Sequence, residues 1–189
     1  MFSSPVAEPR SPKDILRRAC TLPLVTTRPR EGWKLPAGAF ESLPGWRLAI
    51  VGDGPLRAEL EALAEDLNIA SRIDWIGQVS NPAAYLKGAK FFVLTSRFEG
   101  SPNALLEAMA CGLSAVVSDA SPGPLELIRD EDAGLVVPVK DVEATTAAIM
   151  RLADDPALRE RLGQAAIART EIHKLDQAMD AWLELLKCA

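Results

Sequence analysis

Residues 91–112 read FFVLTSRFEGSPNALLEAMACG, and this stretch decides the fold. The apolar run at 91–94 predicts a buried strand. The largely apolar segment after Pro102 predicts a helix that ends near Gly112. Ser101 is typical of an N-cap, and Pro102 is typical of the first helical position, where its missing N–H costs nothing. The stretch therefore indicates a strand, a short loop and a helix.

The start of this predicted helix indicates an anion-binding site. The first backbone N–H groups of a helix have no partner within it, and the helix dipole places partial positive charge there. These groups would face whatever lies beside Gly100 and Ser101, most naturally a phosphate group. Glu99 lies in the loop before this site, and Glu107 lies one to two turns into the helix.

Glu107 has an unusual setting, because the segment 104–111 contains no other polar side chain. A solvent-facing stripe is therefore hard to draw on this helix. A carboxylate buried there needs hydrogen-bond donors, and ligand hydroxyls would supply them. The plainer alternative is that Glu99 is a solvated loop residue and Glu107 a surface position. We favour the binding role for both.

From Trp46 onward the chain alternates between short apolar runs and helical patterns. The apolar runs predict strands at 47–51, 72–76, 91–95, 115–118 and 135–137. The helical patterns predict helices at 55–67, 82–89, 102–110, 124–128, 141–153, 156–170 and 175–187. Strands that alternate with helices over short connections form a doubly wound parallel sheet. The predicted fold class is therefore α/β, with a Rossmann-like sheet.

Three residues of interest come just after predicted strands: Gly52 and Asp119 follow theirs directly, and Glu99 follows within four residues. Sheets of this kind bind ligands at the carboxyl ends of their strands. We therefore expect these three residues at one edge of the sheet.

The segment 1–45 differs from the rest of the chain. Its prolines would break most helices laid across them, at Pro5, Pro9, Pro12, Pro23, Pro29, Pro36 and Pro44. We expect 1–45 to be a poorly ordered or atypical lead-in and 46–189 to form the folded domain. Residues 1–34 carry seven Lys and Arg against three Asp and Glu, whereas 35–189 carry 14 against 23. An acidic body argues against nucleic acid as a partner.

The cysteines and the histidine restrict the possible chemistry. Cys20, Cys111 and Cys188 are odd in number and lack C-x-x-C spacing, which argues against a disulfide or metal framework and fits a reducing cytoplasm. His173 is the only histidine, so a Ser-His-Asp triad or a His-based metal site is excluded within this chain. No apolar run approaches the roughly 20 residues of a membrane span, and residues 1–5 lack the order of a signal peptide. We expect a cytoplasmic protein.

Residues 97–112 resemble the E-x7-E signature of retaining GT-B glycosyltransferases, and the closest group is family 4, called glycosyl transferases group 1. Further blocks match in the same order, namely LAIVGDGP at 48–55 and GPLELIR at 123–129 followed by GLVVP at 134–138. The resemblance implies the C-terminal, donor-binding half of a GT-B fold. It also implies a parent chemistry of retaining transfer of a hexosyl unit from a nucleotide-diphosphate sugar.

The resemblance assigns roles to individual residues. It implies that Glu99 faces the sugar as the catalytic residue and that Glu107 binds the ribose hydroxyls. Phosphate and sugar oxygens are held by N–H groups in the set Gly100, Ser101, Asn103, Ala104 and Leu105. The resemblance also implies that Gly52 and Asp53 lie beside the donor cleft and that the base packs beside the loop at the end of the segment 75–79.

The resemblance also implies which cofactors and partners to expect. The family works without metal, so the D-x-D form at 130–132 is interpreted as a solvated turn and no cofactor is expected. The implied partners are the nucleotide-sugar donor and an acceptor-binding domain or separate acceptor subunit. Peripheral association with a membrane through the acceptor is a further implication.

The sequence departs from the family pattern upstream. Family members carry an Arg and a Lys that hold the donor diphosphate, but alignment on Gly32 puts Thr26 and Glu31 at those positions. Losing two cations aimed at a leaving group costs orders of magnitude in rate. A catalytically inactive remnant, or a nucleotide-sugar-binding or interaction module, therefore remains the alternative. A GT-B epimerase or phosphorylase is disfavoured because catalytic histidines and a lysine cofactor signature are missing.

Overall fold

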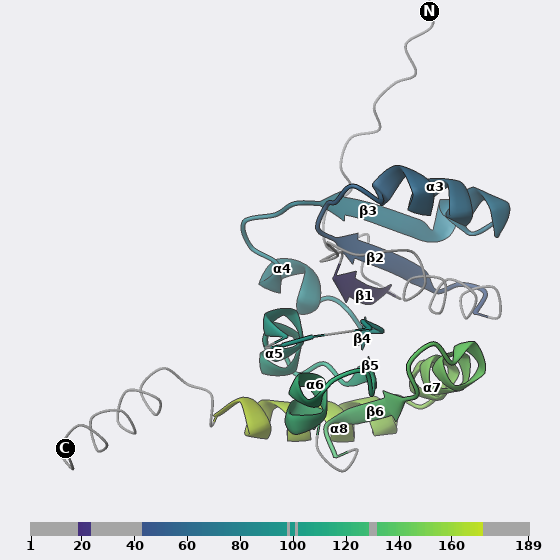
Figure 1. The fold of residues 1–189 in the computed structure, drawn as a ribbon. Helices are drawn as coiled ribbons and strands as arrows, with labels where there is room; N and C mark the ends of the chain where they lie inside the picture. The colour runs from purple at the N-terminus through teal and green to yellow at the C-terminus, as the bar shows by residue number, and fades with distance from the viewer. Residues whose placement is uncertain (1–18, 24–42, 98, 101, 129–131, 172–189) are drawn as a thin grey trace, which may run out of the picture.

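The sheet at the centre of the molecule has six parallel strands (Figure 1). The computed structural model describes residues 19–23, 43–97, 99–100, 102–128 and 132–171. The strands are β1 (Ala19–Pro23), β2 (Arg47–Val51), β3 (Ile73–Gly77), β4 (Phe91–Leu94), β5 (Ala115–Ser118) and β6 (Gly134–Val137). The order across the sheet is β3-β2-β1-β4-β5-β6. This is the strand order of a doubly wound dinucleotide-binding sheet, so the predicted fold class is confirmed.

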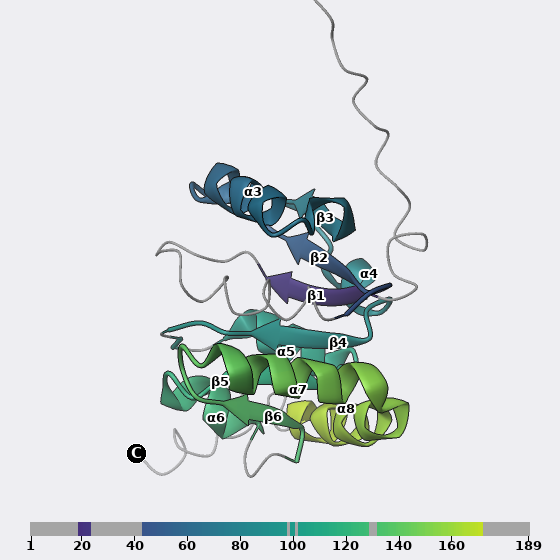
Figure 2. The same cartoon turned by 90° about the vertical axis from the view of Figure 1, so that its right-hand side faces the viewer.

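Helices connect the strands and cover both faces of the sheet. They are α3 (Arg57–Asp66), η1 (Ala70–Arg72), α4 (Ala83–Leu86), α5 (Asn103–Ala110), α6 (Pro122–Ile128), α7 (Val142–Asp154) and α8 (Pro156–Thr170). All six predicted helices within the described residues form, with bounds shifted by a few residues at most. The helix predicted at 175–187 lies outside the described residues. Figure 2 shows α7 in front of the sheet and α5 behind it.

Strand β1 corrects the predicted domain boundary. It lies within 1–45, yet it pairs with β2 from Ala19 to Pro23 and with β4 at Cys20 and Thr21. A strand with neighbours on both sides is central to a sheet, so the folded unit includes residues before Trp46. The strand prediction missed it because Ala19–Pro23 is short, shows no alternation and lies among prolines. Its conformation is set by its two neighbours rather than by its own sequence.

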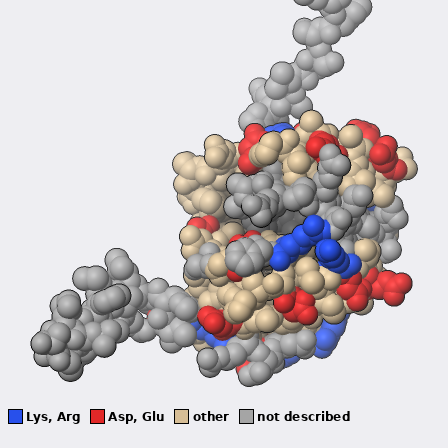
Figure 3. All heavy atoms as spheres, viewed as in Figure 1, with Lys and Arg blue, Asp and Glu red and all other residues tan. Residues whose placement is uncertain are grey.

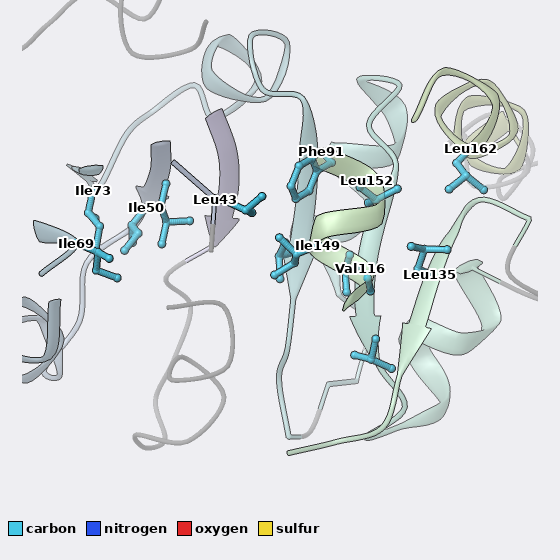
Figure 4. Close-up of a cluster of buried hydrophobic side chains, with 14 of the residues drawn as sticks. Leu43, Ile50, Ile69, Ile73, Phe91, Val116, Leu135, Ile149, Leu152 and Leu162 are labelled. Atoms are coloured by element: carbon cyan, nitrogen blue, oxygen red, sulfur yellow. The ribbon is translucent and has the colours of Figure 1, made fainter. Parts of the chain in front are cut away.

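The hydrophobic core consists of two clusters, one on each face of the sheet. Both include residues of β4, because successive side chains of a strand point to opposite faces. Phe91 points to one face, where it packs with Ile149 and Leu152 of α7 (Figure 4). Val93 belongs to the same cluster. Phe92 and Leu94 point to the other face, and their cluster includes helices α4, α5 and α6. All four β4 side chains are buried, as expected for a central parallel strand. Each large apolar side chain buried in this way contributes about 1.5–3 kcal/mol.

Helix α8 contacts both clusters, because Leu158 and Leu162 belong to the first and Ala166 to the second. It lies along the β6 end of the sheet (Figure 1). The Asp155 side chain accepts a hydrogen bond from the Leu158 N–H at 2.9 Å and so caps the helix start. The sheet is therefore covered on both faces, and α8 packs against it at the β6 end.

Surface charge is mixed on the face shown in Figure 3. Acidic side chains are spread around its periphery, and a small group of basic side chains lies near its centre. In the part of the chain that the structure describes, no helix is long and apolar enough to cross a membrane.

Candidate functional site

A cavity of about 410 Å³ opens where the strand order reverses, between β1 and β4. In open α/β sheets ligands bind at this point, beyond the carboxyl ends of the strands. The end of β2, the loop after β3, strand β4 and the start of α5 line it. Its apolar wall includes Val51, Val79, Leu86 and Leu94, and its polar lining is Gln78, Glu99, Asn103 and Glu107. Glu99 and Gly52, predicted at one edge of the sheet, therefore face one cavity.

The start of α5 differs in detail from the prediction. Pro102 is the N-cap residue, with φ −80° and ψ 80°, rather than the first helical residue. Its carbonyl accepts hydrogen bonds from the N–H groups of Leu105 at 2.9 Å and Leu106 at 3.1 Å. The ψ angle of Pro102 is not helical, so the first helical N–H groups belong to Asn103 and Ala104. The predicted N-cap, Ser101, lies outside the described residues.

The set of amides that could hold an anion is therefore smaller than predicted. Leu105 is fully buried and its N–H is used within the helix. The N–H groups of Asn103 and Ala104 precede the first hydrogen bond of the helix, and both residues line the cavity. The positive end of the α5 dipole is directed at the same space. Gly100 is exposed, in the loop before the helix.

Glu99 is held by hydroxyl groups from two loops. The Ser96 O–H donates to Glu99 Oε1 at 2.5 Å, and the Glu99 backbone N–H donates to Ser121 Oγ at 3.0 Å. The Ser118 O–H donates to the Ser96 carbonyl, which ties the loop after β4 to the end of β5. Ser118 and Ser121 are buried. The Glu99 carboxylate therefore has a defined orientation and is not simply solvated.

Gly123 brings α6 against the Glu99 loop. A Cβ atom at this position would lie 1.9 Å from the Gly100 carbonyl oxygen, closer than any real contact. A Cβ atom at Gly100 itself would have nothing within 4 Å. Gly123 is therefore required by close backbone approach, whereas Gly100 has open space around its Cα.

We expect Gly123→Ala to destabilise the fold by about 1–3 kcal/mol, because the new methyl group must displace backbone atoms. The matched variant Gly100→Ala should change the free energy of unfolding by less than about 0.5 kcal/mol. Urea unfolding followed by circular dichroism measures both. Equal stability of the two variants would contradict the close approach.

The environment of Glu107 corrects the prediction that its carboxylate is buried. Glu107 is exposed, as are Asn103 and Ala110, and this spacing forms the solvent-facing stripe of α5. The apolar run concealed the stripe because alanine is tolerated at exposed positions. Glu107 still lines the cavity together with Asn103, one turn earlier. Glu107 therefore lies at the rim of the cavity. Because its side chain is exposed, it needs no ligand to supply hydrogen bonds.

Gly52 lines the cavity, whereas the Asp53 side chain forms a hydrogen bond within the adjacent turn. The Gly52 N–H donates to the Gly77 carbonyl at 2.8 Å, and its φ of 120° favours glycine. Asp53 Oδ1 accepts a hydrogen bond from the Gly54 N–H at 2.8 Å. Its other oxygen is 3.7 Å from Arg57 Nη1. Gln78, from the loop predicted to lie beside a base, lines the cavity.

The other predicted positions lie away from the cavity or outside the described residues. Asp119 accepts a hydrogen bond from the Val139 N–H at 2.7 Å and so joins the ends of β5 and β6. Asp132 is 3.4 Å from Arg169. In the described ranges, no group of three or more His, Cys, Asp and Glu side chains could hold a metal ion. Positions outside the description include Thr26, Glu31, Asp130 and Glu131.

Cys111 follows α5 and has a perturbed thiol. Burial is the largest cause that raises the pKa of Cys111, Lys87 lowers it, and the negative charge of Glu107 raises it further. Because the pKa is raised, the thiol stays protonated at neutral pH and is a poor nucleophile.

Sequence reasoning missed the residues that support Glu99, namely Ser96, Ser118, Ser121 and Gly123. Only Gly123 carried a signal, as the first residue of a block that matches a family pattern. The serines lie at the end of β5 and in the segments that follow β4 and β5, and their proximity follows from β4 and β5 being neighbours in the sheet.

Comparisons with known proteins identify the family and the fold. A sequence model of the family described as glycosyl transferases group 1 matches residues 19–169, starting at the first residue of β1. An exopolysaccharide phosphotransferase from Streptomyces coelicolor is 37% identical over 79% of this chain and 16% of its own length. A 4-alpha-N-acetylgalactosaminyltransferase from Campylobacter jejuni is 33% identical over 74% of this chain and 39% of its own. A lipopolysaccharide core biosynthesis glycosyltransferase, LpsE from Rhizobium meliloti, is 34% identical over 83% and 46%.

Solved structures show the same architecture. A sucrose-phosphate synthase from Thermosynechococcus elongatus aligns with a TM-score of 0.78 and 27% identity, over 91% of this chain and 46% of its own. Anabaena HepE, solved in complex with UDP, aligns with a TM-score of 0.82 and 18% identity, over 93% and 50%. The chain spans half or less of each of these proteins, and the fold is that of the C-terminal half of a GT-B glycosyltransferase. The chain belongs to the glycosyl transferases group 1 family.

Proposed function

We propose that this chain is the donor-binding domain of a glycosyltransferase whose parent chemistry is retaining transfer of a hexosyl unit from a nucleotide-diphosphate sugar. One observation carries the proposal: a single cavity is lined by Glu99, by Glu107 and by the first residues of α5. Its volume of about 410 Å³ lies within the about 300–1,000 Å³ typical of small-molecule sites. Family membership and the UDP complex of HepE support it.

The chemistry of the lining matches the parts of such a donor. The N–H groups of Asn103 and Ala104, at the positive end of α5, suit the diphosphate. Glu107, at the rim, suits the ribose hydroxyls, since a carboxylate is a strong acceptor for O–H donors. The apolar wall beside Gln78 suits the flat face of a base.

Glu99 is assigned to the sugar. Transfer that breaks a glycosidic bond develops positive charge at the anomeric carbon. A carboxylate held beside that carbon stabilises this charge without having to reorganise during the reaction. The hydrogen bonds from Ser96 and to Ser121 supply the fixed position that this role requires.

The donor would come with further partners that the relatives suggest. The Campylobacter and Rhizobium relatives are named as glycosyltransferases. An acceptor-binding domain or separate acceptor subunit would complete the cleft, and the acceptor would bring the protein to a membrane surface from the cytoplasm. No metal is assigned a role.

Calorimetry with UDP, GDP and ADP, with and without EDTA, tests the binding step. We expect weak, metal-independent binding of one nucleoside diphosphate. Glu107→Ala should weaken it by about 1.5–3 kcal/mol, because a charge-assisted hydrogen bond to a ribose hydroxyl is lost. The matched control Glu65→Ala removes an exposed carboxylate from α3 and should leave the affinity unchanged.

A deoxynucleotide makes the assignment of Glu107 specific. The 2′-deoxy analogue should bind the parent chain more weakly than the ribonucleotide does, and Glu107→Ala should abolish this difference. Binding that requires Mn²⁺, or an affinity that Glu107→Ala leaves unchanged, would contradict the proposal.

The alternative function is a catalytically inactive remnant or a nucleotide-sugar-binding module. The departure at Thr26 and Glu31 favours it, since the diphosphate would lack its usual cations. Both proposals predict donor binding and differ in turnover.

A further inference from the structure

Three serine side chains surround the loop that carries Glu99, and in the described part of the chain none of them lines the cavity. Ser118 is the last residue of β5, and Ser121 lies in the turn that follows it. Ser96 lies two residues after the end of β4. Side chains that hold a site residue without facing the ligand act through that residue.

Two connections fix Glu99 relative to the sheet. The first runs from the buried Ser118 hydroxyl to the Ser96 carbonyl, and from the Ser96 hydroxyl to Glu99 Oε1. The second runs from the Glu99 backbone N–H to the buried Ser121 hydroxyl. Both ends of Glu99, backbone and carboxylate, are therefore tied to the end of β5 or the turn after it.

The Ser96 hydroxyl holds one of the two carboxylate oxygens of Glu99. Oε1 accepts the Ser96 hydrogen bond, while Oε2 is engaged by no residue in the described ranges. A carboxylate with one oxygen held presents the other in a single direction, which is the preorganisation that a binding site needs.

The geometry points to Ser96 as the positioning residue that aims Glu99 Oε2 at the donor sugar, with Ser118 and Ser121 holding the loop. This inference rests on the proposed function. It goes beyond it by predicting that a residue outside the cavity sets the affinity for the sugar part of the donor and leaves the affinity for the nucleotide part unchanged.

The test measures the sugar increment, defined as the Kd of the nucleoside diphosphate divided by the Kd of its nucleotide sugar. The probes are UDP with UDP-glucose and UDP-N-acetylglucosamine, and GDP with GDP-mannose. We expect Ser96→Ala to lower the sugar increment by about threefold to tenfold, the value of one hydrogen bond, while the nucleoside diphosphate binds as before. Ser96→Thr keeps a hydroxyl and should retain the increment.

A double-mutant cycle separates positioning from general disruption. Ser96→Ala should have no further effect on the sugar increment once Glu99→Ala is present, because the two changes remove the same interaction. Ser96→Cys replaces the hydroxyl by a slightly larger thiol, which is a weak donor, so it should show the loss even if Ser96→Ala folds poorly. Ser71→Ala, at an exposed serine in η1, is the matched control and should change nothing.

The possible results separate the role of Ser96 from the binding of nucleotide. A chain that binds nucleoside diphosphate but shows the full sugar increment in Ser96→Ala and Ser96→Cys overturns the role of Ser96 alone. A parent chain without any sugar increment also overturns it, because Glu99 then does not contact the sugar. A chain that binds no nucleotide overturns the proposed function, and the inference with it.

Discussion

A polypeptide of these 189 residues is expected to bind a nucleotide sugar and to transfer none of it at a useful rate. Holding two reactants in attack geometry supplies up to about 7–11 kcal/mol of a barrier reduction. The chain spans 39% and 46% of the lengths of two glycosyltransferase relatives. The site is also open, because Gly100, Asn103 and Glu107 are exposed to solvent. An open site cannot exclude water from the reacting centre.

The rate of sugar transfer is measured as release of nucleoside diphosphate in a coupled assay. The assay covers several donors, with simple sugars and lipid-linked compounds as acceptors. Glu99→Ala is the control that identifies turnover at this site. Turnover by this chain alone that is lost in Glu99→Ala would contradict the prediction.

Adding a separately produced acceptor domain distinguishes the two proposals for function. If turnover appears, the chain is a competent donor half. If the donor binds but turnover stays absent, the remnant is favoured, because the resemblance puts Thr26 and Glu31 at the positions of the two cations that the family pattern has for the diphosphate.

A chain that begins at Trp46 is expected not to fold. It lacks β1, which pairs with β2 along its whole length and with β4 at two positions. Without β1 the backbone groups of β2 and β4 that faced it become unpaired edges, which invite aggregation. The loss is comparable to the whole folding free energy of about 5–15 kcal/mol.

Urea unfolding of the shortened chain measures this effect and should show no cooperative transition. The matched control removes residues 1–15 only, which leaves every described strand in place, and it should unfold cooperatively. A stable, cooperatively folding 46–189 fragment would show that β1 is dispensable.

The sequence predicted β2 to β6 well because their apolar runs are bounded by glycine, proline and polar turns. β1 was missed for a physical reason. Its five residues end at Pro23 and carry no periodicity, so only the neighbouring strands determine their conformation. Pairings between distant segments leave no local signal in the chain.

The site was predicted in part. The strand, loop and helix around Glu99 follow from the local sequence, and both glutamates do line one cavity. The exposure of Glu107 was misjudged because Ala110 counts as apolar while lying on the solvent face. The serines around Glu99 could not be found, since the contact of Ser118 with Ser96 depends on the parallel register of β4 and β5.

The strand order has a consequence for how the molecule assembles. Strands β1 to β3 form one half of the sheet and β4 to β6 the other, each from strands that are consecutive along the chain. The halves join where Cys20 meets Phe91 and Thr21 meets Phe92, between segments far apart in sequence. Such non-local pairing closes the largest loop and slows folding.

The cavity lies across the junction of the two halves, with Val51 and Gly52 from one half and Leu94 and Glu99 from the other. A ligand that contacts both halves binds only when they are joined, and it would therefore stabilise the pairing of β1 with β4. Amide protons of β1 and β4 should then exchange more slowly when the cavity is filled, while those of β6 should respond less.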